Sequence, residues 1–232
     1  MQPDAHIQHR ASRSLYAYWN ALRAGRRAPR RLEIQPAQLG GLLLDTFILE
    51  RTDRSTFLFR LAGTRVSGWL GADLRTRNFL SCWGEADRAM LERHLSAISE
   101  LGRVGLFTGE GYPSAGPAPV HSRAAGAPFE LIVLPLMHTG QTIDRLLCLL
   151  VSLDETVPDT LRPFHGLKLL AAEEIWPEGV SSDPFALTDP PPALHPNVRM
   201  ARIVRQGRRQ FRVYQGGRVG DAQDAQVEAE RP

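Results

Sequence analysis

The feature that most constrains the fold is a pair of strongly apolar segments separated by only four residues. The segments are 129–137 and 142–153, and His138-Thr139-Gly140-Gln141 lies between them. Two such runs joined by a short glycine-containing link are typical of a β-hairpin. Pro135 lies inside the first run and has no backbone N–H to donate, so we expect an edge position or a bulge there. The chain therefore requires an antiparallel sheet.

A second hairpin is predicted earlier in the chain. Residues 46–50 and 56–61 are rich in Phe and Leu, and a polar link separates them. With the two-residue period of a strand, one face of the second segment carries Phe57, Phe59 and Leu61.

Two helices are expected before that hairpin. The first begins at Leu15 with Ser14 as its cap and ends near Gly25. Its apolar positions recur at helical spacing and comprise Leu15, Tyr18, Trp19 and Leu22. The second covers residues 36–44, where Pro36 suits the first turn. The apolar stripe of the first helix must be covered either by the chain's own sheet or by a second copy.

The clearest helix covers Glu85–Leu101 and ends at Gly102. Its apolar stripe comprises Met90, Leu91, Leu95, Ile98 and Leu101. Short helices and turns are expected over the glycine-punctuated segment 62–79. A strand is expected over 103–110, followed by a loop rich in Pro, Gly and Ala at 111–126.

The composition excludes several classes of protein. The 232 residues are 43% hydrophobic and 23% charged, which is typical of a globular protein and not of a disordered tail. No apolar run approaches the ~18 residues of a membrane span, and residues 1–13 lack the apolar core of a signal peptide. Two cysteines cannot form a disulfide framework, so we expect a cytoplasmic protein.

Charge is unevenly distributed, although the net charge is only +3. Residues 1–31 contain seven arginines against one aspartate, and residues 195–218 contain seven arginines and no acid. Residues 150–190 contain eight acids against two basic residues. The basic segments suit phosphate or an acidic partner, but solvated surfaces are the favoured interpretation because charge segregation alone is common.

These patterns divide the chain into four predicted parts. They are a flexible N-terminus at 1–13, a folded domain at 14–153, an acidic proline-rich extension at 154–198, and a basic segment with a disordered tail at 199–232. A weak helix is expected over 163–176. Alternation around Phe211 predicts a strand within 199–215.

Five short segments, in order along the chain, carry a family resemblance. They are Tyr18–Pro29, Glu33–Pro36, Phe57–Arg65, Ile143–Leu147 and Gln215–Arg218, similar in turn to the patterns YWxxLRxGRxxP, DIxP, FRFRLAGTR, DRLLG and EGGR. On these residues the chain resembles the alphaproteobacterial single-domain PAS family, over residues 14–153 and a fragment near 205–218. Cys148 departs from the family pattern, which has a glycine at that place.

The resemblance implies a fold and a kind of function. The implied fold is α+β, a PAS-like curved antiparallel sheet of about five strands with covering helices and an N-terminal flanking helix. The implied function is that of a non-catalytic sensory or adaptor protein. Such a protein binds a small-molecule ligand or signals through contacts with a protein partner, and it forms a homodimer. The glycine-rich stretch 62–71 and the helix from Glu85 are the elements expected to move.

Candidate pocket residues cluster around the glycine-rich stretch and the long helix. They are Arg65, Trp69, Phe79, Trp83, Met90 and His94. The aromatic side chains suit either a planar ligand or the core. Arg65 suits either a ligand anion or a structural ion pair. The corresponding candidates for a dimer contact on the flanking helix are Leu15, Tyr18, Trp19 and Leu22.

Cofactor chemistry has one candidate residue. His94 lies on a helix at a position comparable to the iron ligand of haem-binding PAS proteins, although a packed histidine is the favoured interpretation. A flavin is not expected, because Phe79 follows Asn78 where light-sensing relatives have their reactive cysteine. We interpret Cys82 and Cys148 as small buried residues. No metal site is expected, since the pair of His6 and His9 offers too few ligands.

Two other classes of function compete with signalling. The first is a nucleic-acid-binding regulator that uses residues 199–218, where Phe211 and Tyr214 lie among arginines. No helix-turn-helix or zinc pattern accompanies that segment, so it ranks second. An enzyme ranks last, because no nucleophile elbow and no phosphate-binding loop occurs in the sequence.

Overall fold

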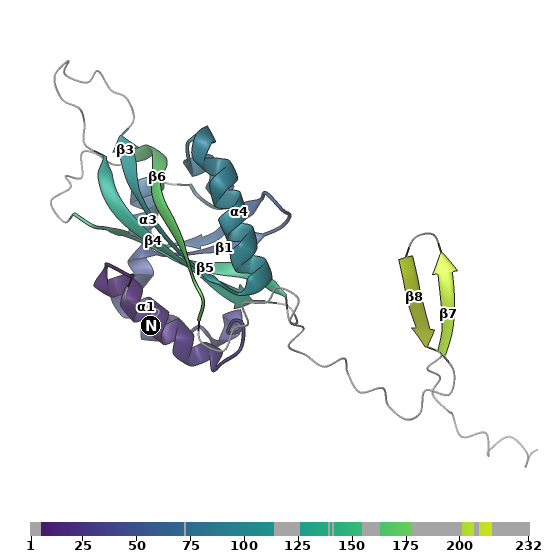
Figure 1. Cartoon of the computed structure of the whole chain (residues 1–232). Helices are drawn as coiled ribbons and strands as arrows, with labels where there is room; N and C mark the ends of the chain where they lie inside the picture. The colour runs from purple at the N-terminus through teal and green to yellow at the C-terminus, as the bar shows by residue number, and fades with distance from the viewer. Residues whose placement is uncertain are drawn as a thin grey trace, which may run out of the picture. The chain divides into compact units, whose positions relative to one another are not determined.

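The longer of two units contains a six-stranded antiparallel sheet with helices on both faces (Figure 1). The computed structural model describes residues 6–71, 73–113, 126–138, 140, 142–154, 163–177, 201–206 and 209–214. In the last two ranges it describes the backbone alone. The two units are residues 1–184 and 185–232, and each is considered by itself.

The sheet of the first unit has the strand order β2-β1-β5-β4-β3-β6. The strands are β1 Thr46–Arg51, β2 Phe57–Ala62, β3 Val104–Pro113, β4 Ala127–Met137, β5 Ile143–Ser152 and β6 Phe164–Ile175. Every neighbouring pair in this sheet is antiparallel. The hairpin of β4 and β5 lies in the middle, so the two most apolar segments of the chain form the centre of the sheet.

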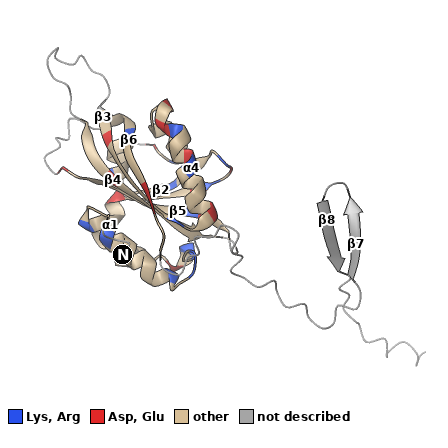
Figure 2. Ribbon diagram, viewed as in Figure 1, with Lys and Arg blue, Asp and Glu red and all other residues tan. Residues whose placement is uncertain are grey.

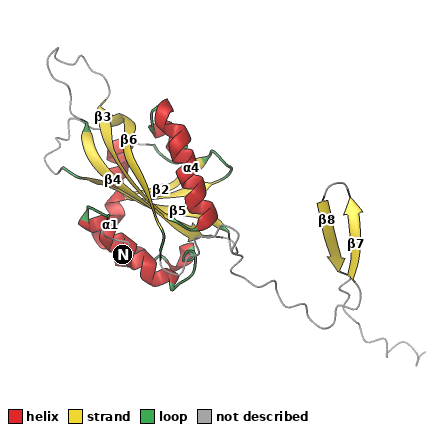
Figure 3. Ribbon diagram, in the orientation of Figure 1, coloured by secondary structure: helices red, strands yellow, loops and turns green. Residues whose placement is uncertain are grey.

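Helices cover the two faces of this sheet (Figure 3). The helical segments are α1 Arg10–Arg23, η1 Arg31–Glu33, α2 Pro36–Leu39, η2 Gly40–Asp45, α3 Thr64–Leu70, η3 Phe79–Cys82 and α4 Glu85–Leu101. The long helix α4 packs on one face, here called the inner face, together with α3 and η3. The N-terminal helix α1 packs on the opposite, outer face.

The central strands are buried on both faces. On β4, Leu131 and Val133 belong to the inner hydrophobic cluster, whereas Ile132 and Leu134 belong to the outer one. Because successive side chains of a strand point to opposite faces, a strand covered on both sides must be apolar at nearly every position. This requirement explains the apolar run at 131–137, which directly follows the buried Glu130.

The predicted α+β fold class is confirmed, with six strands in the sheet where about five were expected. The sixth strand, β6, corrects the prediction of a weak helix over 163–176. Its buried side chains are Phe164, Leu167, Leu169 and Ile175, and they are not evenly spaced, because the pairing of β6 with β3 shifts register twice. The resulting three-residue interval between Phe164 and Leu167 imitates a helical spacing.

Two further boundaries differ from the sequence prediction. α1 begins at Arg10 and not at Leu15, and His9, not Ser14, caps it by accepting a hydrogen bond from the N–H of Ala11. The single helix predicted over 36–44 is a short α-helix followed by the 3₁₀-helix η2, because the chain breaks at Gly40, where φ is +51°.

Pro135 lies in an interior strand and not in an edge strand. The pairing of β3 with β4 ends at Val133, however, so no strand requires an N–H from Pro135 on that side. A register shift with β5 follows directly after Leu136. The freed carbonyl of Pro135 instead accepts a hydrogen bond of 2.8 Å from Nε1 of Trp19 on α1.

The second unit contains a two-stranded antiparallel hairpin of β7 Ala201–Gln206 and β8 Arg209–Tyr214. The strand predicted around Phe211 is therefore confirmed. Most of the predicted loop 111–126, most of the acidic extension and the tail after residue 214 lie outside the described residues.

Candidate functional site

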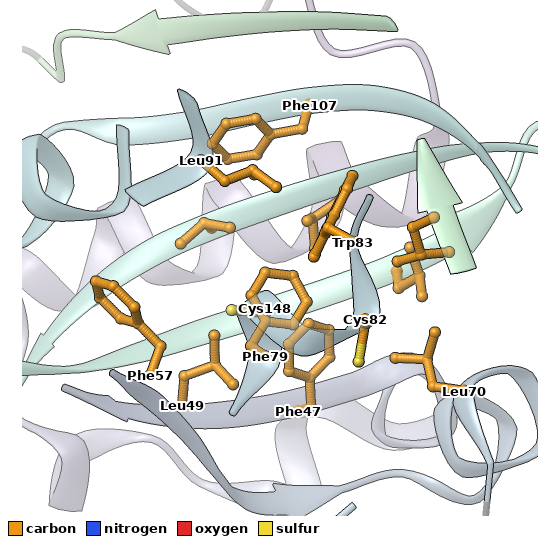
Figure 4. Packing of buried hydrophobic residues seen from close by; sticks show 14 of the residues in the cluster. Phe47, Leu49, Phe57, Leu70, Phe79, Cys82, Trp83, Leu91, Phe107 and Cys148 are labelled. Atoms are coloured by element: carbon orange, nitrogen blue, oxygen red, sulfur yellow. The ribbon is translucent and has the colours of Figure 1, made fainter. Parts of the chain in front are cut away.

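The inner face of the sheet is filled by a cluster of aromatic side chains (Figure 4). Phe79 and Trp83, two of the predicted pocket residues, are each 1% exposed. Their rings pack edge to face with centroids 5.7 Å apart, and Trp83 packs in the same way against Phe129 at 5.9 Å. Trp69 is also buried and packs edge-on against Phe164 of β6. These aromatic residues come together as the packed core of the domain.

The other predicted pocket residues do not join this cluster. Met90 is 41% exposed, so its assignment to the buried stripe of α4 is wrong. The buried stripe consists of Leu91, Leu95 and Ile98, and Met90 lies one residue, or about 100°, away from Leu91 around the helix. Arg65 lies on α3 and forms an ion pair with Asp45 at the end of η2. The sequence left two alternatives for Arg65, a ligand anion or a structural ion pair, and the structure contains the ion pair.

An apolar groove lies on the outer face, over the edge of the sheet that ends in β2. Its volume is about 330 Å³, which is within the range of small binding sites. Its walls come from η1, α2, η2, β1 and β2 together with Leu147 of β5, and its apolar lining includes Leu32, Ile34, Pro36, Leu39, Leu43, Ile48 and Leu61. We call this feature the outer groove.

Exposed leucines gather around the outer groove. Leu32 is 82% exposed, Leu61 is 53% exposed, and Leu43 and the adjacent Leu44 are each more than a third exposed. Among the described residues only two other large apolar side chains, Met90 and Leu170, are this exposed. Single exposed leucines need no explanation, whereas a contiguous group marks a surface that binds something.

An irregularity in the sheet places Leu61 in the groove. The pairing of β1 with β2 shifts register between Ile48 and Leu49, so Ile48 pairs with Leu61 while Leu49 pairs with Phe59. Arg60 is the extra residue of this bulge, and beyond it the alternation is reversed. Leu61 therefore faces the outer groove, and the prediction that it shares a face with Phe57 and Phe59 is wrong.

Gly63, directly after β2, allows the backbone of η2 to approach closely beside the groove. It lines the groove, and its N–H donates a 2.8 Å hydrogen bond to the carbonyl of Thr46. A Cβ atom at this position would overlap the backbone carbonyl oxygens of Leu43 and Leu44 in η2. A glycine is thus required here for close approach of two backbone segments.

No groove residue was singled out from the sequence as functional. The sequence does carry one signal, which is the run of three leucines Leu42-Leu43-Leu44 directly after two glycines. Consecutive residues lie on different sides of a helix, so a short helix cannot bury all three leucines against one surface. The sequence did not reveal the groove itself, because it depends on the bulge in β2 and on which part of the outer face α1 leaves uncovered.

Comparison with known protein families adds to this geometry. The family model of the PAS domain matches residues 7–151. The chain belongs to the PAS-domain family. No curated protein and no solved structure gives a significant match. Membership in the PAS family indicates a role in sensing or signalling.

His94, the candidate haem ligand of this PAS domain, is part of a charged cluster between α4 and β6. Its Nδ1 lies 2.7 Å from Oε1 of Glu174, and its ring packs edge-on against Phe107. Arg103 also donates to Glu174 and stacks over Trp176. Because His94 is held at the edge of the core among charged groups, these residues do not fit a haem pocket, and we do not assign His94 to haem.

The two cysteines of the PAS domain lie in the inner hydrophobic cluster. Cys82 and Cys148 are both free and buried, as predicted. Burial raises the pKa of both thiols, so neither favours the reactive thiolate form. Among the residues that the structure describes, no three His, Cys, Asp or Glu side chains gather as metal ligands do. Within the same residues, no helix has the length and apolar character to cross a membrane.

The flanking helix of the PAS domain packs on its own sheet. Leu15 and Trp19 are fully buried in the outer cluster, while Tyr18 and Leu22 are partly exposed at its margin. The start of α1 is fixed by the buried carboxylate of Glu130 on β4, which accepts hydrogen bonds from the backbone N–H groups of residues 8 and 9. The apolar stripe of α1 therefore packs against the sheet of the same chain.

Proposed function

We propose that this PAS protein is a non-catalytic cytoplasmic signalling adaptor whose outer groove receives an apolar, acidic segment of a partner protein. The observation that carries the proposal is that three exposed leucines, Leu32, Leu43 and Leu61, line one groove on the outer face. Burial of a leucine side chain contributes about 1.5–3 kcal/mol. Several leucines in one groove therefore provide enough apolar surface for a specific protein contact.

The charge of the groove supports an acidic partner. Arg31 lines the groove, and among the described lining residues there is no carboxylate to neutralise it. Arg31 also lies at the end of the basic N-terminal region, whose arginines are visible on and after α1 in Figure 2. A segment with leucine-sized apolar residues and a flanking Asp or Glu matches both the lining and the charge.

The packing of the inner face favours a protein partner over a ligand in the core. Phe79, Trp83 and Phe129 already make close ring contacts there, so a planar ligand has to displace them. A second copy of the chain is the alternative occupant of the outer groove. We do not propose dimerisation through α1, because Leu15 and Trp19 are already buried against their own sheet. Binding of nucleic acid is likewise not proposed, since the side chains of 199–218 lie outside the described residues.

Site-specific photo-crosslinking tests this function. A benzophenone amino acid replaces Leu61 in the groove or, as a matched control, Leu170, which is 56% exposed on β6 and is not among the lining residues of the groove. Both proteins are irradiated in the cells that produce the chain, and the crosslinked peptides are sequenced by mass spectrometry.

The expected result is a crosslink from position 61 and not from position 170, to a peptide of another protein that contains leucine-like residues beside Asp or Glu. Replacement of Arg31 by Glu should abolish that crosslink, because it reverses the charge of the groove. A crosslink to a basic peptide, equal crosslinks from both positions, or a crosslink to a second copy of the chain contradicts the proposal.

A further inference from the structure

We propose that a second cavity, between the start of α1 and α3, binds a small organic anion with an apolar body. This cavity has a volume of about 500 Å³, within the range of ligand sites. Among its lining residues are Arg10, Ser14, Leu42, Arg65, Trp69 and Val151. It is distinct from the outer groove, with which it shares no lining residue. We call it the anion cavity.

The charged groups of the anion cavity favour a negative ligand. Two guanidinium groups, those of Arg10 and Arg65, line it together with the single carboxylate of Asp45. Arg65 is paired with Asp45, yet about half of its side chain remains exposed. Within the part of the chain that the structure describes, Arg10 has no acidic partner. A carboxylate or phosphate group placed between the two arginines can therefore form charge-assisted hydrogen bonds with both.

The rest of the lining suits an apolar body attached to that anionic group. Leu42 and Val151 supply aliphatic surface, and the indole of Trp69 supplies an aromatic surface. The hydroxyl of Ser14 adds a group that can donate to the anion. The wall of the cavity is thus polar and apolar in similar measure, which suits a ligand that carries both an anionic group and an apolar body. Arg65 and Trp69 were both candidate pocket residues in the sequence, and both line this cavity.

The anion cavity adjoins the outer groove through η2. Leu42 and Asp45 of this segment line the anion cavity, whereas the next residues, Leu43 and Thr46, line the outer groove. η2 is a short 3₁₀-helix that begins with two glycines, and it lies directly over Gly63. An anion that pulls Arg65 away from Asp45 removes one restraint on η2, and so changes the wall of the groove. This regulatory consequence rests on the proposed function; binding of the anion does not.

Isothermal titration calorimetry of the full chain tests the anion site. The probes are phenyl phosphate and phenylacetate, with neutral phenylacetamide as the control for the apolar body. We expect both anions to bind and the amide to bind at least about tenfold more weakly, since a hydrogen bond between charged groups is worth that factor or more. Arg10→Gln should weaken both anions by a similar factor. The matched control Arg93→Gln, an exposed arginine on α4 outside this cavity, should leave them unchanged.

Three results overturn the anion site: no heat from either anion at millimolar concentration, equal affinity for the amide, or equal losses in the two arginine variants. The comparison of the two anions identifies carboxylate or phosphate as the preferred group. Calorimetry involves no partner protein, so failure of the anion site is separate from failure of the outer groove. If anions bind but leave the crosslink from position 61 unchanged, the coupling through η2 is wrong while the anion site stands.

Discussion

At the scale of single residues, the outer groove depends on two small departures from regular structure. One extra residue in β2, Arg60, turns Leu61 out of the core, while Phe57 and Phe59 stay fully buried. Arg60 itself forms an ion pair with Glu50 of β1, which pairs in turn with Arg145 of β5. The bulge is thus held by charges across three strands, and it is a fixed feature of the sheet edge.

Substitution of Gly63 tests the close approach of η2. In Gly63→Ala the new methyl group meets the carbonyl oxygens of Leu43 and Leu44, so backbone must move. We expect a loss of about 1–3 kcal/mol in the free energy of unfolding, measured by urea denaturation. Gly68→Ala is the matched control, because Gly68 lies in α3 with open space around it and alanine favours a helix. The account of Gly63 fails if the two variants are equally stable.

At the scale of elements, Glu174 joins α4, β3 and β6. It accepts hydrogen bonds from His94 on α4 and from Arg103, which directly precedes β3. Burial raises the pKa of Glu174, but the hydrogen bonds from Arg103 and His94 outweigh it and bring the pKa below its ordinary value of 4.5. A carboxyl whose pKa is lowered by folding stabilises the fold when it is ionised.

The stability of the domain should therefore depend on pH through Glu174. The contribution is fully present above pH 4.5 and is lost as the pH falls through the lower pKa of the folded state. At pH 7 we expect Glu174→Gln to cost about 1–2 kcal/mol, and the difference from the wild type should shrink in urea titrations below pH 4.5. Glu173→Gln is the control, since its carboxylate is half exposed and pairs with His6. An equal pH dependence in wild type and Glu174→Gln would refute this role.

At the scale of the whole molecule, the sheet is completed by β6, which lies beyond residues 7–151 of the family match. β6 pairs along the length of β3 and buries Phe164, Leu167 and Leu169 against the inner cluster. β6 is an edge strand of the sheet, and its last residue, Ile175, is buried in the outer cluster.

Removal of β6 should unfold the domain. A chain that ends at Leu153 loses four large buried side chains of β6, each worth about 1.5–3 kcal/mol, which is comparable to the whole stability of many domains. We expect that chain to lack cooperative thermal unfolding by circular dichroism, while a chain that ends at Pro184 melts like the full protein. Cooperative melting of the shorter chain at the same temperature would mean that β6 is dispensable.

The sequence predicts the elements whose patterns are local. The bounds of α4 and the central hairpin agree with the structure within a few residues, because helix caps and long apolar runs act on neighbouring residues. β6 is the main failure, since two register shifts disturb the two-residue period by which a strand is recognised. The prediction of the face on which Leu61 lies fails for the same reason, because a register shift between β1 and β2 disturbs the alternation there.

The amino-acid sequence by itself determined the α+β class, the family and most of the elements of this protein, because these follow from periodicity and from short motifs. Tertiary structure alone decided that the aromatic residues fill the core, that α1 covers its own sheet, and that leucines distant in sequence form the outer groove. The physical reason is that burial depends on which surfaces meet, and a bulge or a packed helix changes that without any change in local preference.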